Sequence, residues 1–296
     1  MDEERALRFS ADFQREDQDR LAFNRLAGEM FSGLDFEPWY QIGGWDSSVR
    51  PFAFFDGREA AACLLAVEQP FWLAGRRYQT VQLGCVAAAP AWRGRGLARR
   101  LMEQALESCP ADMAFLYANR QAAGFYRHMG FCQAQYYRYR LSGEELDGLA
   151  PESPPLKRLD PMRPEDRARL LELYRLGDSL AEPGLRGAGE GVFLFHCMRA
   201  WRHIFEIVGW DALVLLRRRY PDLLCGGIWG GQGRSLRELL AAASGSEARH
   251  ILLGFTPTEK AGLVCEPLEE PDTLLFVKGE NLFDHRQIEI PVTART

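Results

Sequence analysis

The sequence predicts an α/β protein with mixed sheets, arranged as two successive domains. Three observations indicate this class. A strand, a turn rich in Gly and Arg, and a helix follow one another over 79–102; a polar segment with three prolines interrupts the chain at 142–155; and the order of elements before that segment recurs after it. The 296 residues, 47% of them apolar, suffice for two hydrophobic cores. We therefore expect domains at 1–141 and 156–296, joined by a linker at 142–155.

In the first half, alternating apolar residues indicate strands, and apolar residues three or four apart indicate helices. The pairs Asp56-Gly57 and Ala74-Gly75 mark hairpin turns, whereas Pro90 and Pro110 end a strand and a helix. The expected elements are a strand at 7–13, a helix at 16–30, an irregular aromatic segment at 31–40, hairpin strands at 51–55 and 60–67, a central strand from 79 that ends before Pro90, a helix from 96 that closes within 107–112, a strand at 113–118, a helix at 121–129 and a last strand at 131–141 that completes the sheet.

The same signals continue beyond the polar segment. The expected elements are a strand at 156–159, a helix at 164–176, a turn at 184–191, a helix at 193–205, strands at 210–216 and 223–229, a helix at 236–243, and strands at 250–255 and 274–277. This order of strand, two helices, hairpin, helix and strand repeats that of the first half, so we expect a second domain of similar fold.

Composition narrows the classes of function. No run of about 18 apolar residues is present, and the acidic start, Met1 to Arg5, leads into no apolar segment, so we expect neither a membrane span nor a signal peptide. Seven cysteines without CxxC spacing favour a reduced, cytoplasmic protein. A net charge of −5 argues against nucleic-acid binding and fits attraction of a cationic amine.

The turn Arg93-Gly94-Arg95-Gly96-Leu97-Ala98 has the features of a phosphate cradle. The first turn of a helix presents amides without internal partners, and the helix dipole adds positive charge there. Glycine lets a diphosphate approach the backbone closely. The alternative is an ordinary strand–turn–helix with a solvated basic turn, since short Gly-rich loops are weak signals.

Two motifs resemble those of the GCN5-related N-acetyltransferases, the GNAT superfamily. Arg93-x-x-Gly96-x-Ala98 fits that superfamily's Gln/Arg-x-x-Gly-x-Gly/Ala loop. Further on, a strand that ends in Asn119 and a helix that carries Phe125-Tyr126 and closes with Gly130-Phe131 resemble its second signature. The resemblance covers about 1–141. With the repeated element order it suggests a tandem protein, similar to mycothiol synthase-like and enhanced-intracellular-survival-like acetyltransferases.

The resemblance implies an N-acetyltransferase that moves an acetyl group from acetyl-CoA to a primary amine by direct attack. It implies that Tyr126 is the general acid toward the coenzyme sulfur and that Asn119 binds cofactor or positions a water. The implied cofactor contacts are Val86, Ala87 and Ala88 along pantetheine, and Arg93, Gly94, Arg95, Gly96, Leu97, Ala98 and Arg99 around the diphosphate. The rival interpretation is a non-catalytic acyl-CoA-binding or regulatory protein.

The acceptor side is less defined by the resemblance. Its wall would be lined by Trp39 and Tyr40 or, alternatively, these aromatics simply pack. Many members carry a catalytic Glu where this chain has Gln82, which cannot accept a proton; Glu68, water, or an acceptor amine of lowered pKa are the alternatives. Small polyamines, aminoglycoside-like amines, amino acids and peptide N-termini all remain open as acceptors, and so does the oligomeric state, a homodimer included.

For three further features of the sequence we expect a structural role and not a functional one. The loop Gly230-Gly231-Gln232-Gly233-Arg234-Ser235 lacks the signature spacing, so we expect the second domain to be degenerate and to bind no cofactor. His196 and His203 share a helical face without a carboxylate or thiol partner, and we expect no metal site. Cys85, in the central strand, is interpreted as a small buried residue and not as a nucleophile.

Overall fold

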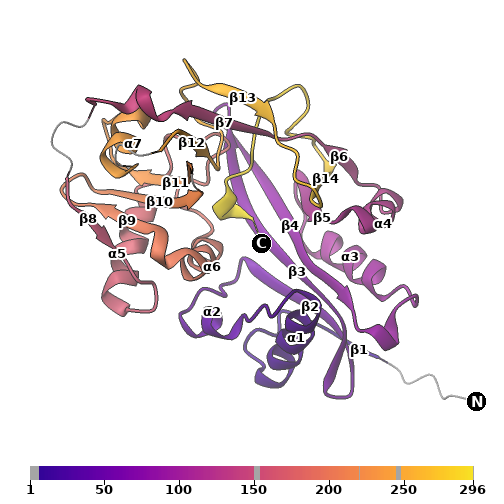
Figure 1. Ribbon diagram of the computed structural model, residues 1–296. Helices are drawn as coiled ribbons and strands as arrows, with labels where there is room; N and C mark the ends of the chain where they lie inside the picture. The colour runs from indigo at the N-terminus through magenta and orange to yellow at the C-terminus, as the bar shows by residue number, and fades with distance from the viewer. Residues whose placement is uncertain (1–6, 150–153, 220, 245–247, 296) are drawn as a thin grey trace, which may run out of the picture.

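Two mixed seven-stranded sheets organise the chain (Figure 1). The computed structural model describes residues 7–149, 154–219, 221–244 and 248–295. The first sheet has the order β1 (Arg8–Ala11), β2 (Val49–Asp56), β3 (Glu59–Leu73), β4 (Arg76–Ala88), β5 (Met113–Ala118), β14 (Leu274–Gly279) and β6 (Cys132–Ala134). The second has the order β13 (Val264–Pro267), β7 (Tyr137–Ser142), β12 (His250–Leu253), β11 (Asp222–Gly230), β10 (Ala212–Arg219), β9 (Ile204–Ile207) and β8 (Leu156–Arg158).

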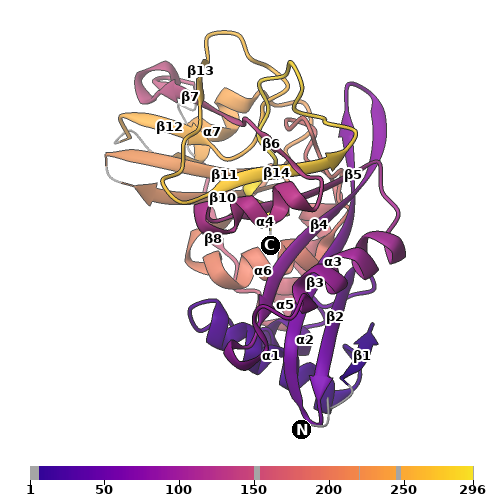
Figure 2. The same cartoon turned by 90° about the vertical axis from the view of Figure 1, so that its right-hand side faces the viewer.

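Helices cover both faces of the first sheet. Their bounds are α1 (Asp17–Met30), α2 (Glu37–Gln41), α3 (Leu97–Ser108) and α4 (Ala123–His128). Strand alternation divides β3 between two cores: Leu64 packs in the core that includes α3, and Leu65 in the core that includes α1 and α2. The helices α3 and α4 face the viewer in Figure 2. The second half adds α5 (Pro164–Arg175), α6 (Glu190–Ala200) and α7 (Leu236–Ser244).

The two hairpins predicted in the first half are confirmed. Asp56 pairs with Glu59 across the turn between β2 and β3, where Gly57 has φ 59°. Ala74 and Gly75 both have positive φ, 51° and 76°, between β3 and β4. Positive φ at both central residues gives the turn the twist of the strands that it joins.

The prediction that 131–141 completes the first sheet is wrong. Only Cys132–Ala134 stays there as β6, whereas Tyr137–Ser142 crosses into the second sheet as β7, between β12 and β13. The place between β5 and β6 is taken by β14, near the end of the chain. Apolar alternation marks a strand but not its neighbours, so the sequence pattern could not reveal this exchange. The linker and the domain boundaries remain predictions. The first sheet includes β14, which follows the predicted linker in the chain, and the second sheet includes β7, most of which precedes it.

The predicted helix at 193–205 is shorter. It ends as α6 at Ala200, and the residues from Ile204 to Ile207 form β9 instead. Ile204 and Ile207 are fully buried, and β9 pairs along β10, so burial of the β-branched side chains in a sheet decides the local structure. In the segment at 31–40, Pro38 lies in the first turn of α2, a position that tolerates proline. Among the described residues, no helix has the length and apolar character needed to cross a bilayer.

Candidate acyl-transfer site

The strands β4 and β5 pair in parallel and then separate. Their register covers only three pairs, of which Gln82 with Phe115 is the last. Beyond it β4 continues to Ala88, past an irregularity in its pairing with β3 where Cys85 has φ 50°. The edge of β4 from Val86 to Ala88 therefore lies next to a separation in the sheet. An extended ligand with amide groups can pair with such an edge as an added strand.

The turn before α3 leaves backbone amides open. Gly94 and Gly96 have φ 75° and 73°, and a Cβ placed on either would meet no atom within 4 Å. The Arg100 amide donates to the Gly96 carbonyl at 3.1 Å, so the amides of Leu97, Ala98 and Arg99 precede the hydrogen-bonded ladder of the helix. Open space, free amides and the positive end of α3 together fit a diphosphate.

The arginines of this turn are exposed and differ in how they are held. Arg93 reaches the Ala88 carbonyl at 3.4 Å, and the Arg95 guanidinium lies 4.6 Å from the Trp92 ring centroid. Both contacts are with uncharged groups, so they leave the charge uncompensated. Arg99 instead pairs with Glu103 at 2.9 Å. Of the three, Arg93 and Arg95 therefore have more positive charge to offer an anion.

Tyr126 lies on α4 within the aromatic core. Its ring centroid is 5.1 Å from that of Phe125, 6.3 Å from Phe131 and 5.9 Å from Phe276 of β14. Among the described residues none accepts a hydrogen bond from its hydroxyl. Burial raises the pKa of Tyr126 to about 12, so the hydroxyl keeps its proton at neutral pH.

Asn119 stands where β5 ends. Its Oδ1 accepts a hydrogen bond from the Ala122 amide at 2.9 Å and so caps the short 3₁₀ turn Arg120–Ala122 that leads into α4. This contact gives Asn119 a structural task, because it fixes the start of the helix that carries Tyr126.

A cavity of about 440 Å³ lies on the other side of β4. It is bounded by the α1–α2 region, β3, β4, α6 and the C-terminal tail, and its lining is Phe31, Leu34, Phe36, Trp39, Leu65, Cys85, Phe195, His196, Arg199, Val292 and Arg295. Trp39 is held there by a hydrogen bond from its Nε1 to the Gly191 carbonyl at 2.7 Å. Cys85, at the irregularity of β4, lines this cavity and directly precedes the strand edge Val86–Ala88 in the chain.

The other predicted acceptor residues lie outside this cavity lining. The Arg20 guanidinium carbon lies 3.8 Å from the centroid of the Tyr40 ring. Glu68 lies 3.5 Å from Arg50, and Gln82 is fully buried. Cys85 is only partly buried, unlike the buried residue that the sequence predicted, and desolvation raises the pKa of its thiol to about 12, so the thiol stays protonated at neutral pH.

Sequence reasoning missed the wall that α6 and the tail contribute. Phe195, His196 and Arg199 come from α6, and Arg295 from the end of the chain. Burial lowers the pKa of His196 to about 4, so the ring is neutral at pH 7, and its Nε2 meets the Arg295 carbonyl oxygen. A carbonyl only accepts, so Nε2 carries the proton in this contact. No motif signals these residues, because they join the site only through the tertiary fold.

The second half also contains a short parallel strand pair, but residues near the end of the chain occupy the space beside it. Its parallel pair, β11 with β12, also spans three residues. The tail enters there: the Val292 amide donates to the Gly254 carbonyl at 2.8 Å, and a Cβ on Gly254 or Gly226 would lie 2.8 or 3.3 Å from the Val292 side chain. The gap that would hold pantetheine is therefore occupied by the chain itself.

The loop before α7 differs in the same way. A Cβ on Gly230 would lie 2.1 Å from the Asp211 carbonyl oxygen, and one on Gly231 would lie 2.8 Å from Leu239, so these glycines serve close packing. The Glu238 carboxylate accepts hydrogen bonds from the Ser235 amide and hydroxyl, both at 2.8 Å. A side-chain anion thus already lies at the start of α7.

Comparison with known proteins assigns the first half. Residues 17–131 match the acetyltransferase (GNAT) family. This segment belongs to the GNAT family. The predicted family is confirmed, and acyl transfer is the class of activity that it supports. No curated protein matches the chain with significance.

Several solved structures, a GCN5-related N-acetyltransferase among them, resemble almost the whole chain. A conserved protein of unknown function and probable N-acyltransferase from Enterococcus faecalis V583 is 14% identical, with a TM-score of 0.58 over 91% of this chain and 72% of that one. A GCN5-related N-acetyltransferase from Kribbella flavida is 18% identical (TM-score 0.54; 91% and 71% covered), and Eis1 from Mycobacterium abscessus is 14% identical (0.54; 91% and 73%). At such identities the likeness shows the fold: a mixed α/β protein of two sheets, consistent with two tandem GNAT-like domains.

Proposed function

We propose that the first half transfers an acetyl group from acetyl-CoA to a primary amine. The observation that carries this proposal is the separation of β4 from β5 beyond Gln82. The β4 edge there is followed by the open turn before α3, and Cys85, the residue before that edge, lines the cavity. The second half, in which the tail and Glu238 fill the equivalent places, binds no cofactor. The seven free thiols fit a reducing, cytoplasmic location, which belongs to the same proposal.

Acetyl-CoA supplies an activated thioester when it is bound. The residues that would hold it are Arg93 and the amides of Leu97 and Ala98 for the diphosphate, and the β4 edge at Val86–Ala88 for pantetheine. A backbone amide of this edge serves as a donor to the acyl oxygen. Tyr126 keeps a proton available for the thiolate that leaves.

The amine enters the cavity beside Cys85, where Trp39 and Phe36 form an apolar wall. Among the described lining residues there is no carboxylate, and His196 is the neutral group that can take up a proton. Its low pKa makes it a weak base, so acceleration depends chiefly on holding the two reactants in contact. This matches the presence of Gln82 where related enzymes carry a glutamate.

Release of free CoA thiol in the presence of amines tests the proposal. The whole chain is mixed with acetyl-CoA and, in turn, a polyamine, an aminoglycoside, amino acids and a peptide with a free N-terminus, and thiol is measured against hydrolysis without amine. We expect amine-dependent release together with acetylated product by mass spectrometry. Tight binding of acetyl-CoA without amine-dependent release from any class would favour the non-catalytic, regulatory alternative.

A further inference from the structure

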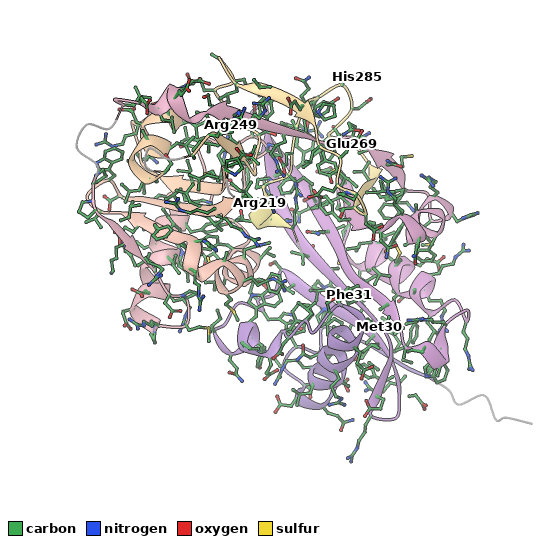
Figure 3. The ribbon with its side chains drawn as sticks, in the orientation of Figure 1. Met30, Phe31, Arg219, Arg249, Glu269 and His285 are labelled. Atoms are coloured by element: carbon green, nitrogen blue, oxygen red, sulfur yellow. The ribbon has the colours of Figure 1, made fainter. Side chains whose placement is uncertain are left out.

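A second cavity of about 440 Å³ adjoins the first and shares His196, Arg199, Val292 and Arg295 with it. Its lining is strongly basic. The charged and titratable members are Arg138, Arg199, Arg217, Arg219 and Arg295, with His196 and His203, against the single carboxylate of Glu270. Arg219, at the end of β10, lies near the C-terminal tail (Figure 3).

The strand β10 directs two of these arginines to the cavity. Side chains of a strand alternate between its faces, so Leu215, Arg217 and Arg219 line the cavity while Arg218 lies on the opposite face. Arg199 approaches from α6. The fold thus brings the guanidinium groups of Arg199, Arg217 and Arg219 to the same cavity, although α6 and β10 are separate in the sequence.

The arginines of the lining are not equally neutralised. Arg138 and Arg295 both pair with the fully buried Glu289, at 2.7 and 2.8 Å. In the part of the chain that the structure describes, no carboxylate lies within ion-pair distance of Arg199, Arg217 or Arg219.

The surroundings of His203 and Glu270 are consistent with a positive electrostatic potential in this cavity. The pKa of His203 is lowered by burial and by the positive charges of Arg217 and Arg202. Glu270 is engaged by the Tyr136 hydroxyl at 2.8 Å. Three guanidinium groups without a counter-charge repel one another, and an anion between them relieves this repulsion.

We propose that the second cavity binds a carboxylate or phosphate group of the acceptor, whose amine extends into the first cavity. This inference rests on the proposed function and names its substrate class: an amine that also carries an anion. Guanidinium groups hold both anions through paired hydrogen bonds. A polycation such as a polyamine or aminoglycoside would be repelled from the same space.

Matched acceptors test the inference. Hexylamine is compared with 6-aminohexanoate, and ethanolamine with phosphoethanolamine, at constant ionic strength and saturating acetyl-CoA. We expect higher kcat/KM for the anionic member of at least one pair; the two pairs distinguish carboxylate from phosphate. In the double variant Arg217→Gln/Arg219→Gln that advantage should fall by about tenfold to a hundredfold, the range for loss of charge-assisted hydrogen bonds. The KM for acetyl-CoA should not change.

Arg218→Gln is the matched control, because it removes an arginine from the other face of the same strand. It should preserve the preference. Turnover of the amines without an anionic group as fast as that of their partners that carry one, or a preference that the double variant keeps, would overturn the inference while leaving acyl transfer intact. If no amine is acetylated, the proposed function fails, and calorimetric binding of the four probes decides the inference: tighter binding of the anionic members that the double variant abolishes supports it, and equal or absent binding rejects it.

Discussion

Tyr126 is buried among aromatic rings, yet none of the described residues accepts a hydrogen bond from its hydroxyl. Because burial holds the pKa of Tyr126 near 12, replacement by phenylalanine removes a proton donor but little packing. We expect Tyr126→Phe to lower kcat by about 10²–10⁴-fold, with little change in the dissociation constant of acetyl-CoA. Single-turnover kinetics and calorimetry measure the two quantities. Tyr78→Phe, at a buried tyrosine of β4, is the control. An unchanged single-turnover rate in Tyr126→Phe would remove Tyr126 from the chemistry.

Glu289 is the anionic centre of a buried cluster. Its side chain is fully buried and accepts hydrogen bonds from Arg138 at 2.8 and 2.7 Å and from Arg295 at 2.8 Å. Glu289→Gln removes the carboxylate with which both guanidinium groups form ion pairs, so the free energy of unfolding should fall by about 3–5 kcal/mol. Urea denaturation measures it. Glu266→Gln breaks the exposed pair with Arg140 and should cost about 1 kcal/mol or less; equal losses in the two variants would contradict this account.

Residues close together in the sequence could be predicted, and those that meet through the fold could not. Gly96 and Tyr126 lie in short motifs with fixed spacing, so the sequence alone singled them out. His196, Arg199 and Arg295 reach the site from α6 and the chain end. From the sequence, His196 could be recognised only as one of two histidines on a helical face. Nothing local to α6 indicates that it lines the same cavity as Cys85 of β4, because that arrangement depends on how the two halves pack.

At the scale of elements, α3 and α7 begin differently although glycines precede both. Before α3 both Gly94 and Gly96 have open surroundings. Before α7, Gly230 and Gly231 allow close packing, and Glu238 occupies the helix start although Gly233 is open. The Gly–Arg turn could be recognised from sequence because its spacing is a motif. The filling of the second turn could not, since it depends on Asp211 and Leu239.

Gly96→Val tests the first of these turns. Valine is strained at φ 73° and places methyl groups in the open space before α3. We expect the affinity for CoA to fall by about tenfold or more, as loss of a charge-assisted hydrogen bond would produce. Calorimetric titration measures it. Gly57→Val has a similar φ of 59° and similarly open surroundings in a distant hairpin, so it should cost stability alone. Wild-type affinity in a folded Gly96→Val protein would show that the diphosphate lies elsewhere.

At the scale of the whole molecule, we expect one CoA to bind per chain. Val292 fills the second strand separation, and Gly230 and Gly231 before α7 are closely packed against Asp211 and Leu239. Calorimetry of the full chain should give a stoichiometry of one. Deleting residues 1–141 is not a usable test, because it removes most of β7 from between β12 and β13. Gly96→Val in the full chain serves instead: two sites in the wild-type chain, of which one keeps its affinity in Gly96→Val, would place a cofactor site in the second half.

The exchange of β7 and β14 between the sheets also determines when the first sheet can fold during synthesis. Until β14, at Leu274–Gly279, leaves the ribosome, β5 and β6 lack the strand that joins them, and Tyr126 lacks its contact with Phe276. At about 5–20 residues per second, the interval between synthesis of β6 and of β14 is on the order of ten seconds. During that interval the family motifs already exist as sequence, but the sheet that positions them is incomplete. The nascent chain therefore cannot complete the first sheet, or the site that the sheet positions, until β14 has been made.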